Sequence, residues 1–228
     1  MPEVTVIDHI KPQKRRISWK AIGIIVLAAV LLVGIIAAVI VFSNWRNNGV
    51  AYAEKLSEQI GVSAETAQKY AHVTLKGASE YACINMAAEE YPYVYESTRT
   101  TNVMGVSIPQ WVIYVQEKNS TMTEVVYYDY RQLQNYGNGV KTNQKINPAG
   151  ITMGMRAEGV RQYVGFDPLC RAYDTKGMHE TYKYYFKDQN TGNTAAYLLT
   201  VTYSDGLVSA VAEEENYFIL NVLTAEGK

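Results

Sequence analysis

The sequence predicts an α+β protein with one N-terminal transmembrane helix, followed by an ectodomain of helices packed on antiparallel sheet. Three observations predict this. Residues 21–42 are an unbroken apolar run, small apolar residues recur at helical spacing after residue 63, and most of the later chain alternates at period two between turn residues. The elements are taken below in chain order.

The apolar run from Ala21 to Phe42 contains no charged residue and no proline. Its 22 residues would span about 33 Å as a helix, and the hydrocarbon core of a bilayer is about 30 Å thick. Trp19 and Trp45 bracket the run, as aromatic residues do at membrane interfaces. The run is longer than the apolar part of a signal peptide, which has about 7–15 residues. We therefore expect a retained anchor rather than a cleaved signal.

The charges that flank the run predict its orientation. Before it stand five basic residues, Lys11, Lys14, Arg15, Arg16 and Lys20, and only Arg46 stands directly after it. By the positive-inside rule, the N-terminus is cytoplasmic and the C-terminal domain is extracellular, at the cell membrane. The region after the helix carries 16 basic and 20 acidic residues, so it has no electrostatic reason to bind nucleic acid or anionic lipid.

The chain before the first strand divides into four stretches. Residues 1–20 are a basic cytoplasmic tail, 21–42 the transmembrane helix, and 43–62 a juxtamembrane helix or linker, helical from Val50 to Ile60 and interrupted by Gly61. Ser63 is a plausible N-cap, and Glu65 places negative charge in the first turn of the next helix. Apolar residues at spacings of three and four predict that this helix runs to about Glu90.

A first α+β unit is predicted over residues 63–136, and a second over residues 151–228. Strands of the first unit are expected at 91–95, 111–116 and 124–130, with a turn at 118–120. Residues 137–150 are rich in Asn and Gly and form a loop or linker. The second unit has a helix at 151–165 and strands at 166–173, 180–187, 195–203, 207–213 and 217–223. An Asp205-Gly206 hairpin turn joins two of these strands.

The two cysteines, Cys83 and Cys170, allow a disulfide on the extracellular side. It would close a loop of about 88 residues, worth roughly 4–5 kcal/mol in the chain-entropy model. Two buried free thiols are the alternative. The sequence does not decide between them, because it does not supply the geometry that a disulfide requires.

Nineteen tyrosines are the strongest bias in the composition. Alternation places several of them on common strand faces, which predicts a tyrosine-lined contact surface for protein or glycan, because tyrosine is enriched at interfaces. A sheet face covered by amphipathic rings is the plainer interpretation. The residues of this candidate surface are Tyr91, Tyr93, Tyr95, Tyr128, Tyr130, Tyr182 and Tyr184.

The remaining residues do not point to an enzyme. The histidines His72 and His179 lack the spacing of metal ligands, and a cysteine nucleophile has no local signature here. The acidic run at 213–215 is more typical of a solvated strand end than of a cation site. We therefore expect no catalytic residues, no metal and no cofactor.

The strand at 111–115 and the segment AAYLLTVTYSDGLVSAV at 195–211 carry a family resemblance. With the basic tail and the single membrane helix, they resemble extracytoplasmic NTF2-like or cystatin-like domains. Such domains occur in inner-membrane scaffold proteins of type IV secretion and Gram-positive conjugation, and in tandem cystatin-like or PepSY-like cell-wall regulators. The resemblance implies either one NTF2-like unit with additions or two cystatin-like units, and a non-enzymatic role through protein contacts.

The sequence thus predicts a membrane-anchored, extracytoplasmic interaction module of an envelope assembly such as a secretion or conjugation apparatus. A ligand-binding or sensing domain for peptide or glycan, or a cell-wall regulator, is the alternative. Expected partners are the membrane and other envelope proteins. Gly34 and Ala38 form a small-xxx-small pair that would also allow a homo-oligomer.

Overall fold

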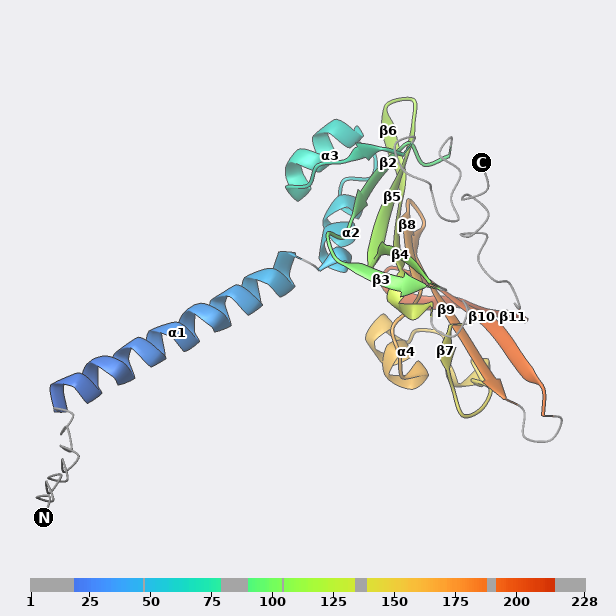
Figure 1. Cartoon of the computed structure of the whole chain (residues 1–228). Coiled ribbons are helices and arrows are strands. Elements are labelled where there is room, and N and C mark those ends of the chain that lie inside the picture. Colours follow the sequence, from blue (N-terminus) through green and yellow to red (C-terminus); the bar gives the residue numbers. More distant parts are fainter. Residues whose placement is uncertain are drawn as a thin grey trace, which may run out of the picture. The chain divides into compact units, whose positions relative to one another are not determined.

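The computed structural model describes residues 19–46, 48–78, 90–103, 105–133, 139–187 and 192–215 (Figure 1). The chain divides into two compact units, Met1–Arg46 and Asn47–Lys228, here called unit 1 and unit 2. Unit 1 contains the helix α1 (Trp19–Arg46), in which side chains are described for Trp19 and for residues 26–38. Within the described residues, the structure shows no helix that is both long and apolar enough to cross a membrane.

Unit 2 begins with two short helices, where the sequence predicts one helix at 50–60 and a long one from residue 63 to about Glu90. The first is α2 (Gly49–Ser57), whose N-cap Asn48 accepts a hydrogen bond from the backbone N–H of Ala51. The second is α3 (Ala64–Ala71), whose N-cap Ser63 accepts from the N–H of Thr66, with Glu65 in the first turn. Both caps satisfy backbone donors that a helix start leaves without partners. The predicted cap at Ser63 is confirmed.

The prediction that the helix after Ser63 continues to Glu90 is wrong. The helix ends at Ala71 because His72 adopts a left-handed conformation, and the side chain of Gln68 then accepts the N–H of Leu75. The β-branched Val73 and Thr74 follow, and they favour extended chain. A two-residue strand, β1 (Lys76–Gly77), comes next, and residues 79–89 lie outside the described part of the chain.

One nine-stranded sheet runs through unit 2, in the order β1-β2-β5-β6-β8-β9-β10-β11, with β7 paired to β9. All pairs are antiparallel except β7 with β9. The α+β class predicted from the sequence is confirmed. The strands are β2 (Tyr93–Glu96), β5 (Trp111–Lys118), β6 (Thr121–Asp129), β7 (Val140–Lys141), β8 (Cys170–Asp174), β9 (Gly177–Lys187), β10 (Thr194–Ser204) and β11 (Leu207–Glu215).

The predicted hairpin turns are confirmed by backbone geometry. Asn119 and Ser120 join β5 to β6, and Asp205 and Gly206 join β10 to β11, all with positive φ. Two successive residues with positive φ make the turn that suits the right-handed twist of paired strands. The predicted strand at 217–223 lies outside the described residues.

The stretch predicted as the loop at 137–150 and the helix at 151–165 has more structure and a shorter helix than expected. It contains β7 and the 3-10 turn η3 (Pro148–Gly150), and the helix α4 covers only Ala157–Val164. Gly154, with a positive φ, keeps the preceding residues out of the helix, and Gly165 ends it in the left-handed conformation.

The helices α2, α3 and α4 cover the same face of the sheet. Register places Tyr127, Arg171 and Glu180 opposite one another on β6, β8 and β9, and directly paired residues point to one face. On this face, α2 and α3 pack over β5 and β6, and α4 packs over β9 and β10. The boundary between these two helical layers therefore falls at β8 and β9.

The opposite face of β2, β5 and β6 is covered by a separate hairpin, β3 (Thr100–Val103) and β4 (Val106–Pro109). Its Val103 and Ile108 pack against Val112, Tyr114 and Val126 of the large sheet. The strands predicted from the sequence do not include residues 100–109. The short turn around Gly105, whose N–H is bound by the side chain of Asn102, explains how two four-residue strands pair.

The sheet is continuous across the predicted division of the ectodomain, because β6 pairs with β8 over five residue pairs. The stretches 63–136 and 151–228 thus share one sheet within unit 2. Their description as two units, and the remaining predicted boundaries, stay predictions.

Gly49 at the start of α2 provides a test of this packing. A Cβ at this position would overlap the ring of Trp111 and approach that of Tyr127. Both rings are buried, with 1% and 2% exposure, so they have little room to move. We expect Gly49→Ala to lower the free energy of unfolding by about 1–3 kcal/mol, measured by denaturant unfolding of the full chain.

Gly159→Ala is the matched control, because Gly159 lies within α4 and its added Cβ would meet only the flexible side chain of Met155, 3.1 Å away. This variant should be neutral or stabilising by up to about 1 kcal/mol through helix propensity. Equal effects of the two substitutions would contradict the packing of Gly49 against the aromatic rings.

Candidate functional site

The most concentrated polar chemistry in unit 2 surrounds the carboxylate of Glu180. This side chain lies at the boundary between the two helical layers and is completely buried, with 0% exposure. Its neighbours come from three other elements: Arg161 from α4, Arg171 from β8 and Tyr203 from β10. Tyr182 joins them from β9 itself, two residues along the strand and on the same face.

Four hydrogen bonds satisfy the Glu180 carboxylate. Its Oε1 accepts from Nη1 of Arg161 at 2.8 Å and from Nε of Arg171 at 3.0 Å. Its Oε2 accepts from the hydroxyls of Tyr182 at 2.7 Å and Tyr203 at 2.9 Å. A buried carboxylate is tolerated only when it is paired and hydrogen-bonded in this way.

The pKa values of the surrounding groups reflect this arrangement. Burial and the adjacent Glu180 raise the pKa of both Tyr182 and Tyr203 above the usual value for tyrosine. Burial acts to lower the pKa of Arg171, but attraction to Glu180 and other acidic neighbours outweighs it, and the pKa is raised. The phenols therefore stay neutral donors and the guanidinium stays charged. The cluster thus acts as a fixed noncovalent crosslink between α4, β8, β9 and β10.

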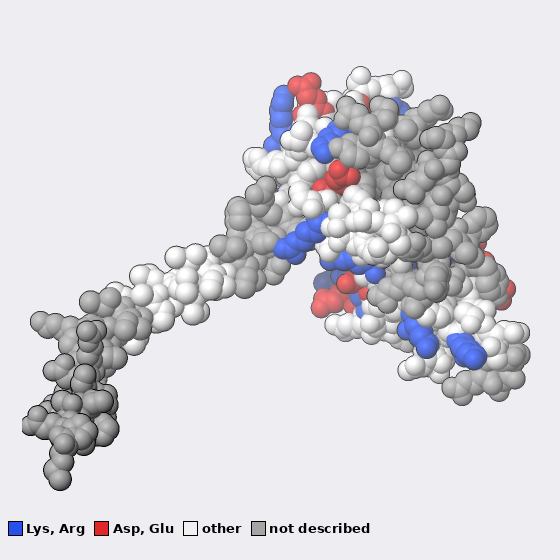
Figure 2. All heavy atoms as spheres, in the orientation of Figure 1, with Lys and Arg blue, Asp and Glu red and all other residues white. Residues whose placement is uncertain are grey.

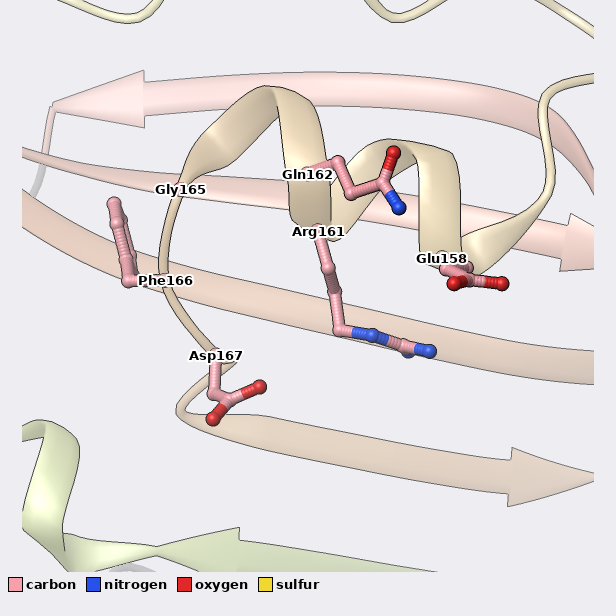
Figure 3. A pocket seen from close by; sticks show the side chains of 6 residues that line it. All are labelled: Glu158, Arg161, Gln162, Gly165, Phe166 and Asp167. Carbon is pink, nitrogen blue, oxygen red and sulfur yellow. The ribbon is translucent and has the colours of Figure 1, made fainter.

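One side of this cluster opens onto solvent. Arg161 is 32% exposed in its side chain and lies in a broad, open depression of about 480 Å³ at the end of α4. Figure 3 shows Arg161 leaving α4 toward the strands, with Asp167 on the segment after the helix. The depression is lined by Glu158, Arg161, Gln162, Gly165, Phe166 and Asp167.

This lining can bind polar groups at a surface, because it offers two carboxylates, an amide and a guanidinium beside an aromatic ring. Arg161 is the exception among these groups, since its guanidinium is already paired with Glu180. A second, smaller depression of about 290 Å³ lies at the start of α3 and is lined by Ala64, Glu65, Gln68, Leu75 and Tyr93.

The hydroxyl of Tyr173 is buried and has no hydrogen-bond partner in the structure. Tyr173 lies on β8, on the same face as Arg171 and two residues further along. Burial is the main cause that raises its pKa, and Arg171 opposes this effect. Tyr173 thus adds a second polar group to the boundary between the helical layers.

The seven tyrosines of the predicted contact surface are mostly core residues. Tyr182 and Tyr184 are fully buried beneath α4, and Tyr91 and Tyr130 are 6% and 1% exposed. They do not lie on a surface, because the helix α4 and the β3–β4 hairpin cover the faces that alternation assigns to them. The other three, Tyr93, Tyr95 and Tyr128, are half-buried.

The first tyrosine group also departs from the expected alternation. Tyr93 and Tyr95 pack toward α2 and α3, and Tyr91 packs on the opposite face, where its ring lies 6.1 Å from that of Tyr114. Strand β2 begins only at Tyr93, after Pro92, so the alternation of the strand does not extend to Tyr91.

Of the two cysteines, Cys170 lies half-buried on β8, where the structure has it as a thiol, and Cys83 lies outside the described residues. Because the position of Cys83 is not described, the disulfide between them stays a prediction. Burial raises the pKa of the Cys170 thiol to about 12, which keeps it protonated and unreactive at neutral pH.

The acidic run at 213–215 lies at the end of β11. Glu213 accepts the hydroxyl of Tyr184 at 2.5 Å and pairs with Lys145 at 2.6 Å. Lys145 also lies over the ring of Tyr197, 4.3 Å from its centre. Within the described part of the chain, no group of three or more His, Cys, Asp or Glu side chains could hold a metal ion.

Comparison of the chain with protein-family models, with curated proteins and with solved structures found no match in any of the three.

Sequence reasoning missed the Glu180 cluster. The available signal was Glu180 itself, a charged residue two and four positions before Tyr182 and Tyr184 on one strand face. A charge on a face that is otherwise aromatic needs partners when that face is buried. The identity of these partners depended on the pairing of β8 with β9 and on the position of α4.

Glu180→Gln tests the cluster. The amide keeps the shape but loses the charge that compensates two guanidinium groups, so we expect unfolding to become easier by about 3–5 kcal/mol. Glu158→Gln is the control: it removes the same charge from the nearby depression and should change stability by less than about 0.5 kcal/mol. Thermal unfolding of both full-length variants measures the difference, and similar stabilities would refute the crosslink.

The buried phenols also predict how stability depends on pH. Burial raises the pKa of Tyr127, Tyr130, Tyr182 and Tyr203 above the unfolded value of about 10. Their contribution is therefore complete below about pH 10 and is lost as the pH rises further, by roughly 1.4 kcal/mol per pH unit for each tyrosine. Phenolate absorbance from these residues should appear together with loss of the β-sheet circular dichroism signal. Full ionisation of the tyrosines with the sheet intact would contradict their burial.

Proposed function

We propose that this protein is a single-pass membrane protein whose unit 2 is a non-enzymatic interaction module outside the cell. Its N-terminus is cytoplasmic, and the module belongs to an envelope assembly such as a secretion or conjugation apparatus. Other envelope proteins are its partners. Within the α+β class, the finer proposal is an NTF2-like domain with additions or a pair of cystatin-like units.

The sequence of the N-terminal region supports the anchor. The apolar run at 21–42 has the length that a membrane span needs, and five basic residues precede it. The described side chains within α1, at residues 26–38, are all uncharged and exposed. Anchoring would hold unit 2 at one surface and raise its effective concentration for partners there.

The observation that supports the interaction role is the packing of polar and aromatic side chains in the interior of unit 2. Glu180, the fully buried carboxylate, has all its hydrogen bonds within the protein, and tyrosine rings occupy the space beneath α4. Tyr182, Tyr184, Tyr203 and Tyr197 are between 0% and 7% exposed. A ligand-binding domain usually keeps a pocket of several hundred Å³ between such elements. Among the described residues, the filled space beneath α4 supports recognition through the outer surface.

The surface of unit 2 is better suited to one specific partner than to nonspecific electrostatic binding. Figure 2 shows acidic and basic side chains interspersed over the described residues of the visible face. Such a surface gives little long-range attraction to nucleic acid, and recognition then depends on local shape and hydrogen bonds.

The alternative is an extracytoplasmic sensor of peptide or glycan, or a cell-wall regulator. The depression beside Arg161 favours it, because the carboxylates of Glu158 and Asp167 face solvent there and have no hydrogen-bond partner among the described residues. Because Phe166 supplies an apolar wall, a small polar peptide is the ligand that fits this depression.

Crosslinking on intact cells of the native host tests the proposal. A single cysteine at Asn119, an exposed turn residue, would be treated with a membrane-impermeant thiol-reactive photocrosslinker in a Cys83→Ser background. We expect discrete adducts with one or a few envelope proteins, identified by mass spectrometry. Cys170 should contribute little background because its thiol is buried and protonated.

A cysteine at Thr5 in the N-terminal tail is the control and should not be modified in intact cells. Modification at Thr5 but not at Asn119 would reverse the topology. Modification at Asn119 without any protein adduct, combined with saturable binding of a peptide or glycan, would favour the sensor.

A further inference from the structure

We propose that the depression beside α4 is a docking site for a lysine or arginine side chain of a partner protein. This inference rests on the proposed function and adds the chemistry of the partner residue. The site, called the α4 depression, is the one of about 480 Å³ lined by Glu158, Arg161, Gln162, Gly165, Phe166 and Asp167.

The charges in and behind the α4 depression favour a cation. Glu158 and Asp167 are exposed, and neither has a hydrogen-bond or ion-pair partner among the described residues. Behind them, the buried Glu180 pairs with Arg161 at 2.8 Å and with Arg171 at 3.0 Å. Three carboxylates and two guanidinium groups leave a net charge of −1, and the carboxylates without a partner are the two that face solvent. A cationic group therefore complements the site.

Arg161 selects against an anion and can bind the backbone beside the cation. Its Nη1 donates to Glu180 at 2.8 Å, and its other N–H groups form no hydrogen bond with the described residues. Figure 3 shows the Arg161 side chain between those of Glu158 and Asp167, so an anion that approached the guanidinium would also meet two unpaired carboxylates. A backbone carbonyl can accept from the free N–H groups without this repulsion.

Phe166 adds a feature that a simple cation does not need. Its ring is half-buried, packs edge-on against Tyr182 at 5.9 Å between ring centres, and lies 6.5 Å from Tyr184. The core thus holds this ring in place while it lines the α4 depression. Lysine and arginine carry an apolar stem below the charged group, and the stem can pack on an aromatic ring while the charge stays near the carboxylates.

The open shape of the α4 depression favours a residue on the surface of another protein. Pockets for free small ligands usually enclose about 70–90% of the ligand, whereas this site is broad and open. A side chain that projects from a partner would gain further contacts with the surface around the site. A second copy of this chain is less suitable, because the region after the apolar run carries 16 basic and 20 acidic residues and two such regions repel each other.

The charge preference is tested by fluorine NMR on the full chain in phosphatidylcholine nanodiscs. The chain has four phenylalanines, all replaced by 4-fluorophenylalanine, and single Phe→Leu variants assign their signals. The probes are three blocked tripeptides, Ser-Lys-Ser, Ser-Gln-Ser and Ser-Glu-Ser. We expect only the lysine probe to shift the Phe166 signal in a saturable way, with a dissociation constant on the order of 1–10 mM. The Phe186 signal should not move.

The double variant Glu158→Gln/Asp167→Asn should weaken binding of the lysine probe about tenfold, because it removes two exposed ion pairs. The matched control Asp205→Asn/Glu214→Gln removes two exposed carboxylates elsewhere in unit 2 and should leave the binding unchanged. The inference would be overturned by an absent Phe166 shift, by equal or tighter binding of the neutral or acidic probe, or by equal weakening in both double variants.

Crosslinking on intact cells tests whether a partner protein occupies the site. The impermeant photocrosslinker is attached at Gln162→Cys, an exposed position in the lining, in the Cys83→Ser background. We expect an adduct with the envelope protein captured from Asn119→Cys, and at least about tenfold less of it when Glu158→Lys is added.

The outcomes of this experiment separate the inference from the proposed function. Capture from position 119 but not from position 162 would overturn the docking site and leave the interaction module standing. Capture from neither position would overturn both. An adduct between two copies of the chain would show that the occupant is a second copy, contrary to the inference.

Discussion

The structure of unit 2 depends on how the Glu180 carboxylate is satisfied. This side chain lies at the place where the sheet passes from the part beneath α2 and α3 to the part beneath α4. Two guanidinium groups and two phenols from four elements meet there on one carboxylate, and the removal of any one of them would leave a buried charge less well compensated.

The tyrosines follow from the same constraint. A buried phenol needs a hydrogen-bond acceptor, and the strands supply one for many of them: Glu180 for Tyr182 and Tyr203, Glu213 for Tyr184, and Glu124 for Tyr91. Pairs of Glu with Tyr thus recur on both faces of the sheet. The composition reflects an interior built from large amphipathic rings, and the polar atoms of those rings determine where the carboxylates can lie.

The sequence predicted what depends on neighbouring residues. The Ser63 cap, the turns at Asn119-Ser120 and Asp205-Gly206, and the strands at β5, β6, β9 and β10 all follow from local chemistry. The prediction failed where contacts between residues far apart in the sequence determine the structure. Alanines at helical spacing suggested one helix to Glu90. Ala71, the last residue of α3, packs in the core between α2, α3 and the sheet, whereas Ala78 packs on the opposite face of the sheet. The partners of Glu180 were missed for the same reason, since only the β8–β9 register brings Arg171 opposite to it.

The Glu180 cluster also bears on the hairpin turns at one end of the sheet. The turns of β5–β6, β8–β9 and β10–β11 share the end of the sheet at Lys118, because Asp174 pairs with Gly177 and Ser204 pairs with Leu207 there. A partner that binds these turns would therefore contact strands from both sides of the Glu180 boundary. The contacts of Glu180 would hold the turns in fixed relative positions, which lowers the entropy cost of binding.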